Sequence, residues 1–149
     1  MIETIQEYAV RTFDHLLGLP GFSDALLKNH FTLYGGYVAN TNKLSAALAQ
    51  LLKDGKTAGA DYMEYKRRFG WEFGGMRLHE YYFEGLTKSP APLKADSKLA
   101  AAIAKDFGSF ELWEKDFRAA GAMRGIGWVS LAYDCWGKRL FNVWTNEHD

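Results

Sequence analysis

Histidine is the residue type in this sequence with the clearest capacity for chemistry, and it occurs four times, as His15, His30, His79 and His148. A neutral imidazole binds transition metals through one ring nitrogen, and imidazole also exchanges protons near neutral pH. A single histidine on an apolar helix face is more often a core residue with a hydrogen-bond partner than a ligand. Two such histidines on neighbouring helices favour a role as metal ligands more than one histidine does, because facing imidazoles can share one ion.

His30 and His79 each lie on the apolar face of a predicted long helix. Apolar residues recur at three- and four-residue spacing over 24–52 and again over 61–86, which is the period of an α-helix. The short polar segment Lys53-Asp54-Gly55-Lys56-Thr57 between them predicts an antiparallel hairpin. We therefore expect the two imidazoles to face each other. Two histidines with one carboxylate form a ligand set that suits iron or manganese.

Three glycines, Gly70, Gly74 and Gly75, interrupt the second predicted helix. Each weakens a helix by roughly 1 kcal/mol relative to alanine. They are tolerable if another backbone or a bulky side chain must come close to this helix.

Other catalytic and binding motifs are absent from the sequence. The single cysteine, Cys135, cannot form an internal disulfide, and no Cys/His spacing of a zinc site occurs. The Gly-x-Gly at 125–127 precedes a predicted strand rather than a helix, which argues against dinucleotide binding. No glutamate stands three residues before His30 or His79, which excludes the Glu-x-x-His pairs of a di-iron carboxylate bundle.

Composition indicates a globular protein and argues against nucleic acid and membranes as partners. The 149-residue chain is 48% hydrophobic, and its 18 basic residues balance 18 acidic ones. A zero net charge gives no electrostatic footprint for nucleic acid. No apolar run approaches the roughly 20 residues of a bilayer-spanning helix, and the N-terminus does not resemble a secretory signal. With the lone cysteine, these features predict a cytoplasmic protein.

The predicted fold class is α+β, with two domains. Residues 1–89 form a long antiparallel helical hairpin, and Ser89-Pro90-Ala91-Pro92 is the linker, since each proline disfavours helix in the residue before it. Residues 93–149 form a small α/β domain with an antiparallel sheet. A two-stranded sheet is marginal alone, so we expect the sheet to be incomplete in this chain. The expected elements are two helices and two strands, at 97–107, 109–120, 127–133 and 139–145.

Several separated motifs resemble the iron/manganese superoxide dismutase family, over nearly all of residues 19–149. His30, followed by Tyr37-Val38-Ala39-Asn40-Thr41-Asn42, is similar to the family's first ligand histidine and its Tyr-Val-x-Asn-x-Asn run. Leu78-His79-Glu80-Tyr81-Tyr82-Phe83 is similar to the motif of the second ligand histidine. Three motifs of the second domain also agree in order: Phe107-Gly108-Ser109-Phe110, Gly125-Ile126-Gly127-Trp128-Val129-Ser130-Leu131 and Glu147-His148-Asp149.

The resemblance implies an activity and a cofactor. It implies that superoxide is converted to oxygen and hydrogen peroxide at one iron or manganese ion per subunit, with His30 and His79 as metal ligands. The third and fourth ligands would come from an Asp-x-Trp-Glu-His motif, which is expected beyond Asp149, so this chain would hold half of the ligands. A homodimer is expected, because an incomplete sheet leaves a strand edge open for pairing.

The resemblance also implies roles for other residues. Tyr37 would be the gateway tyrosine and Tyr34 the second choice, since one residue fewer separates His30 from Tyr37 than in the family. His148 would hydrogen-bond the metal-bound solvent, and Trp128 would wall the metal pocket. Gly75 stands where some iron enzymes place a glutamine, and the choice between iron and manganese stays open.

Two other functional classes are compatible with the sequence. The first is a non-catalytic relative of the family, with a structural or interaction role and without a complete metal site. The second is a helical domain that binds haem or another small ligand, with His30 or His79 as an axial ligand. Metal content separates these classes from a dismutase.

Overall fold

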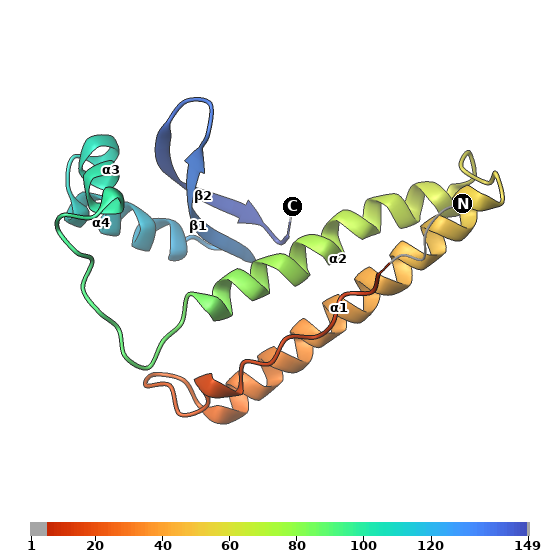
Figure 1. Ribbon diagram of the computed structural model, residues 1–149, viewed down its shortest axis with the longest axis horizontal. Helices are drawn as coiled ribbons and strands as arrows, with labels where there is room; N and C mark the ends of the chain where they lie inside the picture. Colours follow the sequence, from red (N-terminus) through yellow and green to blue (C-terminus); the bar gives the residue numbers. More distant parts are fainter. Residues whose placement is uncertain (1–5, 149) are drawn as a thin grey trace. The chain divides into compact units, whose positions relative to one another are not determined.

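Residues 6–148 of the computed structural model form two compact units, one ending at Ser89 and the other covering 90–148. The first unit is a helical hairpin, and the second holds two short helices and a two-stranded antiparallel sheet (Figure 1). The predicted α+β class is therefore confirmed. Residues 1–5 and Asp149, which belong to the two predicted domains, lie outside the described residues.

The helical hairpin consists of α1 (Asp24–Lys53) and α2 (Ala60–Glu84), which lie side by side and antiparallel (Figure 1). α1 begins after Ser23, whose Oγ accepts a hydrogen bond of 3.2 Å from the Leu26 N–H. Such a cap satisfies an N–H group that has no partner within the helix. Gly55, in the turn between the helices, has a φ of +69°, which glycine adopts without steric cost. Both predicted helices are confirmed.

The core of this unit fills the seam between α1 and α2. Its members come from both helices and from the N-terminal strap, defined here as residues 8–19, which runs along the hairpin (Figure 1). The apolar pattern of α1 includes Leu26, but this side chain is 51% exposed because Leu27 takes the inward position. The buried core residues are Phe13, Leu16, Leu19, Leu27, Tyr34, Val38, Met76 and Phe83.

Hydrogen bonds fix the N-terminal strap to α1. The Asn42 side chain accepts a bond of 2.9 Å from the Tyr8 N–H and donates one of 2.9 Å to the Tyr8 carbonyl. A short 3-10 helix, η1 (Asp14–Leu16), then turns the chain so that Leu16 is fully buried. No sequence period marks the strap, because its contacts are with residues far along the chain.

The second unit contains α3 (Lys98–Phe107) and α4 (Phe110–Gly121), followed by β1 (Gly127–Asp134) and β2 (Arg139–Asn146). The strands pair antiparallel, from Gly127 opposite Asn146 to Asp134 opposite Arg139, as expected for the predicted antiparallel sheet. Serine caps start both helices, at Ser97 and Ser109. The predicted elements of this unit are therefore present.

Polar contacts attach the helices of the second unit to its sheet. The Asp106 carboxylate of α3 accepts a bond of 2.7 Å from the Leu140 N–H of β2. The Trp113 indole N–H of α4 donates a bond of 3.0 Å to the Asn142 side chain of β2. Within the described part of the chain, no helix combines the length and the apolar character needed to cross a membrane.

Replacing Phe83 with alanine should lower the free energy of unfolding by about 3–5 kcal/mol. The side chain is fully buried and contacts the rings of Phe13 and Phe31. Tyr81→Ala is the matched control, because Tyr81 lies on the same helix and is 66% exposed; its effect should stay within about 0.5 kcal/mol. Urea unfolding followed by circular dichroism measures both values, and equal losses would contradict the assigned core.

Candidate metal centre

His30 and His79 lie next to each other across the seam of the helical hairpin. Their ring centroids are 4.9 Å apart, and the ring planes meet at 80°. His30 lies near the start of α1 and His79 near the end of α2, so antiparallel packing brings them to the same level. Helical periodicity predicts this juxtaposition. The role of the two histidines as metal ligands stays a prediction.

The orientation of His79 is set by a hydrogen bond within its own helix. Its Nδ1 lies 2.6 Å from the carbonyl oxygen of Gly75, one turn earlier, and the side chain is 2% exposed. A carbonyl oxygen only accepts, so Nδ1 carries the hydrogen, and in the neutral imidazole Nε2 carries the lone pair. Metal-binding histidines commonly use a backbone carbonyl in this way to fix the ring and its tautomer.

His30 is half-buried among aromatic rings. Its centroid is 4.9 Å from that of Phe83 and 5.5 Å from that of Tyr82. Burial lowers the pKa of His30 below its ordinary value, because an apolar environment disfavours the charged imidazolium. The neutral imidazole that results is the form that can bind a metal.

The geometry of the pair fits part of a metal site. With metal–nitrogen bonds of about 2.1 Å, the centroids of two imidazoles on one ion lie about 5 Å apart. The observed separation of 4.9 Å agrees with this value. Among residues 6–148, no group of three or more His, Cys, Asp or Glu side chains able to hold a metal is present. The pair thus offers two nitrogen donors, and a complete site needs further donors.

Tyr37 packs against the ring of His79. Their centroids are 5.0 Å apart with ring planes at 32°, and Trp71 contacts Tyr37 at 5.4 Å. The Tyr37 ring passes over Gly75, where a Cβ would lie 2.7 Å from the ring. A bulky side chain therefore does come close to this helix at Gly75. At Gly70 a Cβ would meet nothing within 4 Å, and no contact explains that glycine.

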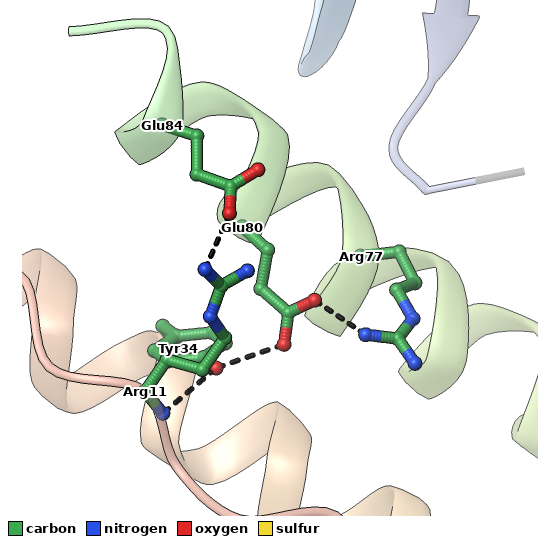
Figure 2. A network of polar contacts seen from close by, with 5 residues as sticks. All are labelled: Arg11, Tyr34, Arg77, Glu80 and Glu84. Atoms are coloured by element: carbon green, nitrogen blue, oxygen red, sulfur yellow. Dashed lines mark hydrogen bonds and ion pairs between the residues drawn. The ribbon is translucent and has the colours of Figure 1, made fainter.

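Tyr34 is fully buried, and its hydroxyl group has two partners (Figure 2). It donates a hydrogen bond of 2.9 Å to Glu80 Oε1 and accepts one of 3.2 Å from the Arg11 N–H of the N-terminal strap. Burial raises the pKa of Tyr34, and the Glu80 carboxylate raises it further. The phenol therefore stays protonated at neutral pH and acts as the donor to Glu80.

Glu80 is a buried member of a partly exposed polar network that sequence reasoning missed. Figure 2 shows its second oxygen paired with Arg77 Nη1, at 2.6 Å, and Arg11 paired with Glu84, at 2.5 Å. The spacing of Arg77 and Glu80 predicts an ion pair on a helix surface. It does not predict burial, because the partner that covers Glu80 is Tyr34, on the other helix.

Trp128 and His148 lie together in the second unit. The Trp128 indole N–H donates a hydrogen bond of 3.0 Å to His148 Nδ1, and the ring centroids are 6.0 Å apart. The Glu147 N–H donates a bond of 2.8 Å to the Ile126 carbonyl, which holds the segment after β2 beside the start of β1. Because an indole N–H only donates, Nδ1 of His148 is the accepting nitrogen. The predicted roles of both residues at a metal site stay predictions.

The fold and the histidine pair define an α+β protein whose helical hairpin presents two adjacent imidazoles. Residues 95–149 match the family model described as iron/manganese superoxide dismutases, C-terminal domain. The superoxide dismutase [Fe] of Cupriavidus metallidurans is 37% identical over 134 residues, which cover 87% of this chain and 66% of that protein. The superoxide dismutase [Mn] 2 of Haloferax volcanii is 32% identical over 134 residues, covering 87% and 64%. The superoxide dismutase [Mn] of Mycobacteroides chelonae is 31% identical over 112 residues, covering 74% and 79%.

The chain therefore belongs to the iron/manganese superoxide dismutase family. It spans about two thirds of the length of the Cupriavidus and Haloferax relatives. The similar proteins include both iron and manganese enzymes by name. Similarity in sequence does not distinguish between the two metals.

Gly75→Ala should lower the free energy of unfolding by about 1–3 kcal/mol, as insertion of a methyl group into a packed site does. The cause is the close approach of the Tyr37 ring. Gly70→Ala, on the same helix and in open space, should raise the stability by about 0.5–1 kcal/mol. Thermal unfolding of the two variants measures the difference. Equal stabilisation by both alanines would show that Tyr37 does not pack on Gly75.

Proposed function

We propose that this protein is a superoxide dismutase, in which His30 and His79 are two of the ligands of one iron or manganese ion per subunit. The observation that carries the proposal is the adjacency of the two imidazoles, at 4.9 Å. Relatives named as iron or manganese superoxide dismutases support it. The overall reaction converts two superoxide anions and two protons to one oxygen and one hydrogen peroxide.

In the hairpin, the two histidines would bind the metal ion, and the aromatic rings would shield it from water. An iron or manganese ion, when bound, supplies the one-electron redox chemistry that no side chain here provides. His79 offers Nε2 in a fixed tautomer, and His30 offers a neutral ring. The rings of Phe83 and Tyr82 pack against the His30 ring and would shield that side of it from water. Such an apolar wall protects reactive species from side reactions.

Protons for the peroxide product have to come through polar side chains near the site. Tyr37, whose ring packs on His79, is the proposed gateway residue on the hairpin. In the second unit, His148 is the proposed hydrogen-bonding residue for the bound solvent, and Trp128 is the proposed wall. The hydrogen bond from Trp128 to His148 supports their joint role, because it fixes the accepting nitrogen of the imidazole. Tyr34 is the second choice for the gateway residue.

The proposal requires two donors besides the histidine pair. The resemblance assigns them to an Asp-x-Trp-Glu-His motif, which the printed sequence does not contain. A homodimer belongs to the same proposal, because each strand of the described two-stranded sheet is paired along one edge only. A cytoplasmic location also belongs to it, since the exposed Cys135 is the sole cysteine.

His79→Ala should abolish iron or manganese retention and superoxide consumption while leaving the helical content nearly unchanged. Loss of a residue that merely orients a ligand costs about 10–100-fold in metal affinity, so loss of a ligand should reduce the metal content to background. His15→Ala is the control, because His15 is exposed on the N-terminal strap. Elemental mass spectrometry gives the metal content, and circular dichroism gives the helical content.

The same measurement distinguishes the rival functional classes. Metal retained by His79→Ala would contradict the assigned site. A metal-free protein with an intact mass of 16.9 kDa, after expression with added iron and manganese, would support the non-catalytic relative. A haem absorbance band that is lost in His30→Ala or His79→Ala would support the haem-binding domain.

A further inference from the structure

The carboxylate of Glu80 is buried directly beside the proposed ligand His79. The residue is 4% exposed, and a glutamate is almost never this buried unless it is paired. Both of its oxygens have a partner: Tyr34 donates to Oε1 at 2.9 Å, and Arg77 donates to Oε2 at 2.6 Å. Removing a carboxylate from water is costly, so these two bonds have to hold it in one orientation.

Tyr34 and Glu80 connect the same two helices that carry the histidines. Tyr34 lies one turn after His30 on α1, and Glu80 follows His79 on α2. The Tyr34 ring also flanks His79, with centroids 6.4 Å apart and planes at 31°. A shift of one helix along the other would therefore stretch the Tyr34–Glu80 hydrogen bond and separate the imidazoles together.

Apolar packing alone does not fix the position of one helix along the other. Apolar burial is non-directional, whereas a hydrogen bond weakens steeply when its length or angle changes. A second bond of the same kind, from Asn40 to the buried Glu72 at 3.2 Å, lies further along the seam. The described seam thus contains at least two polar connections between the helices, and Tyr34–Glu80 is the one beside the histidines.

We propose that Tyr34 and Glu80 are positioning residues for the His30–His79 pair. Their hydrogen bond sets the separation of the two imidazoles and thereby the affinity of the pair for a metal ion. The Arg11 N–H, which donates to the Tyr34 hydroxyl at 3.2 Å, extends this control to the N-terminal strap. The inference rests on the proposed metal role of the pair, but the arrangement it describes exists in the metal-free protein.

Tyr34→Phe removes the bridging hydroxyl and leaves the Arg77–Glu80 ion pair in place. We expect Mn²⁺ to bind about tenfold more weakly, in the range of residues that orient a metal ligand. Glu80→Gln keeps an oxygen that can accept from Tyr34, so its affinity should stay near that of the wild type, whereas Glu80→Ala should lose as much as Tyr34→Phe. Free Mn²⁺, measured by electron paramagnetic resonance during a titration, gives each affinity.

The control is Glu64→Gln. Glu64 pairs with Arg67 at 2.9 Å, with the same three-residue spacing as Arg77 and Glu80. The side chains of Glu64 and Arg67 are both exposed. This variant should bind Mn²⁺ as the wild type does. If Glu80→Gln loses as much affinity as Glu80→Ala while Tyr34→Phe loses none, Glu80 acts through its charge and the positioning role is wrong.

A second readout needs no metal. In the metal-free protein, the nuclear Overhauser effect between the ring protons of His30 and His79 should weaken in Tyr34→Phe and persist in Glu64→Gln. An unchanged nuclear Overhauser effect in Tyr34→Phe would overturn the inference, regardless of the Mn²⁺ affinity of this variant. A wild-type protein that shows the effect but binds no Mn²⁺ would instead refute the proposed function and leave the positioning of the rings intact.

Discussion

The packing of α1 against α2 is the interaction on which the candidate site depends. His30 and His79 are far apart in the sequence, and only the seam between the two helices brings their rings to 4.9 Å. The seam forms because each helix has one apolar face that must be buried. The N-terminal strap adds Phe13 to the same core, where its ring contacts Phe83. Burial of apolar surface and placement of the two imidazoles are thus one event.

The seam is not purely apolar, and this affects how the site is built. Glu72 and Glu80 are both buried on the inner side of α2, and each is paired with an arginine of its own helix and a polar side chain of α1. Buried ion pairs contribute little net stability, because desolvation offsets the attraction between the charges. In this hairpin we infer that their effect is on register. Hydrophobic packing holds the helices together, and the polar pairs decide where along their length they meet.

The sequence predicts those parts of the fold that depend on residues close together in the chain. The helical period over 24–52 and 61–86 reports on neighbours a few residues away, and the structure agrees with it. The adjacency of His30 and His79 follows from two local patterns and one short connection. The strap and Glu80 could not be found in this way. Tyr34 and Glu80 are separated by 46 residues, and a glutamate gives no local sign that a distant phenol will cover it.

The two histidines of the hairpin do not determine which metal the proposed site would bind. Two imidazoles bind most divalent transition metals in an order set by the metals themselves, so in the proposed site the pair would fix the location of the ion and the spacing of two donors rather than the identity of the metal. Gly75 adds a constraint, because the Tyr37 ring occupies the space that a side chain at this position would need. A larger side chain at this position, such as glutamine, would need the space that the Tyr37 ring occupies. In this chain the hairpin therefore contributes aromatic packing rather than an amide beside the histidines. In the proposed site, discrimination between iron and manganese would have to come from the other donors and their hydrogen bonds.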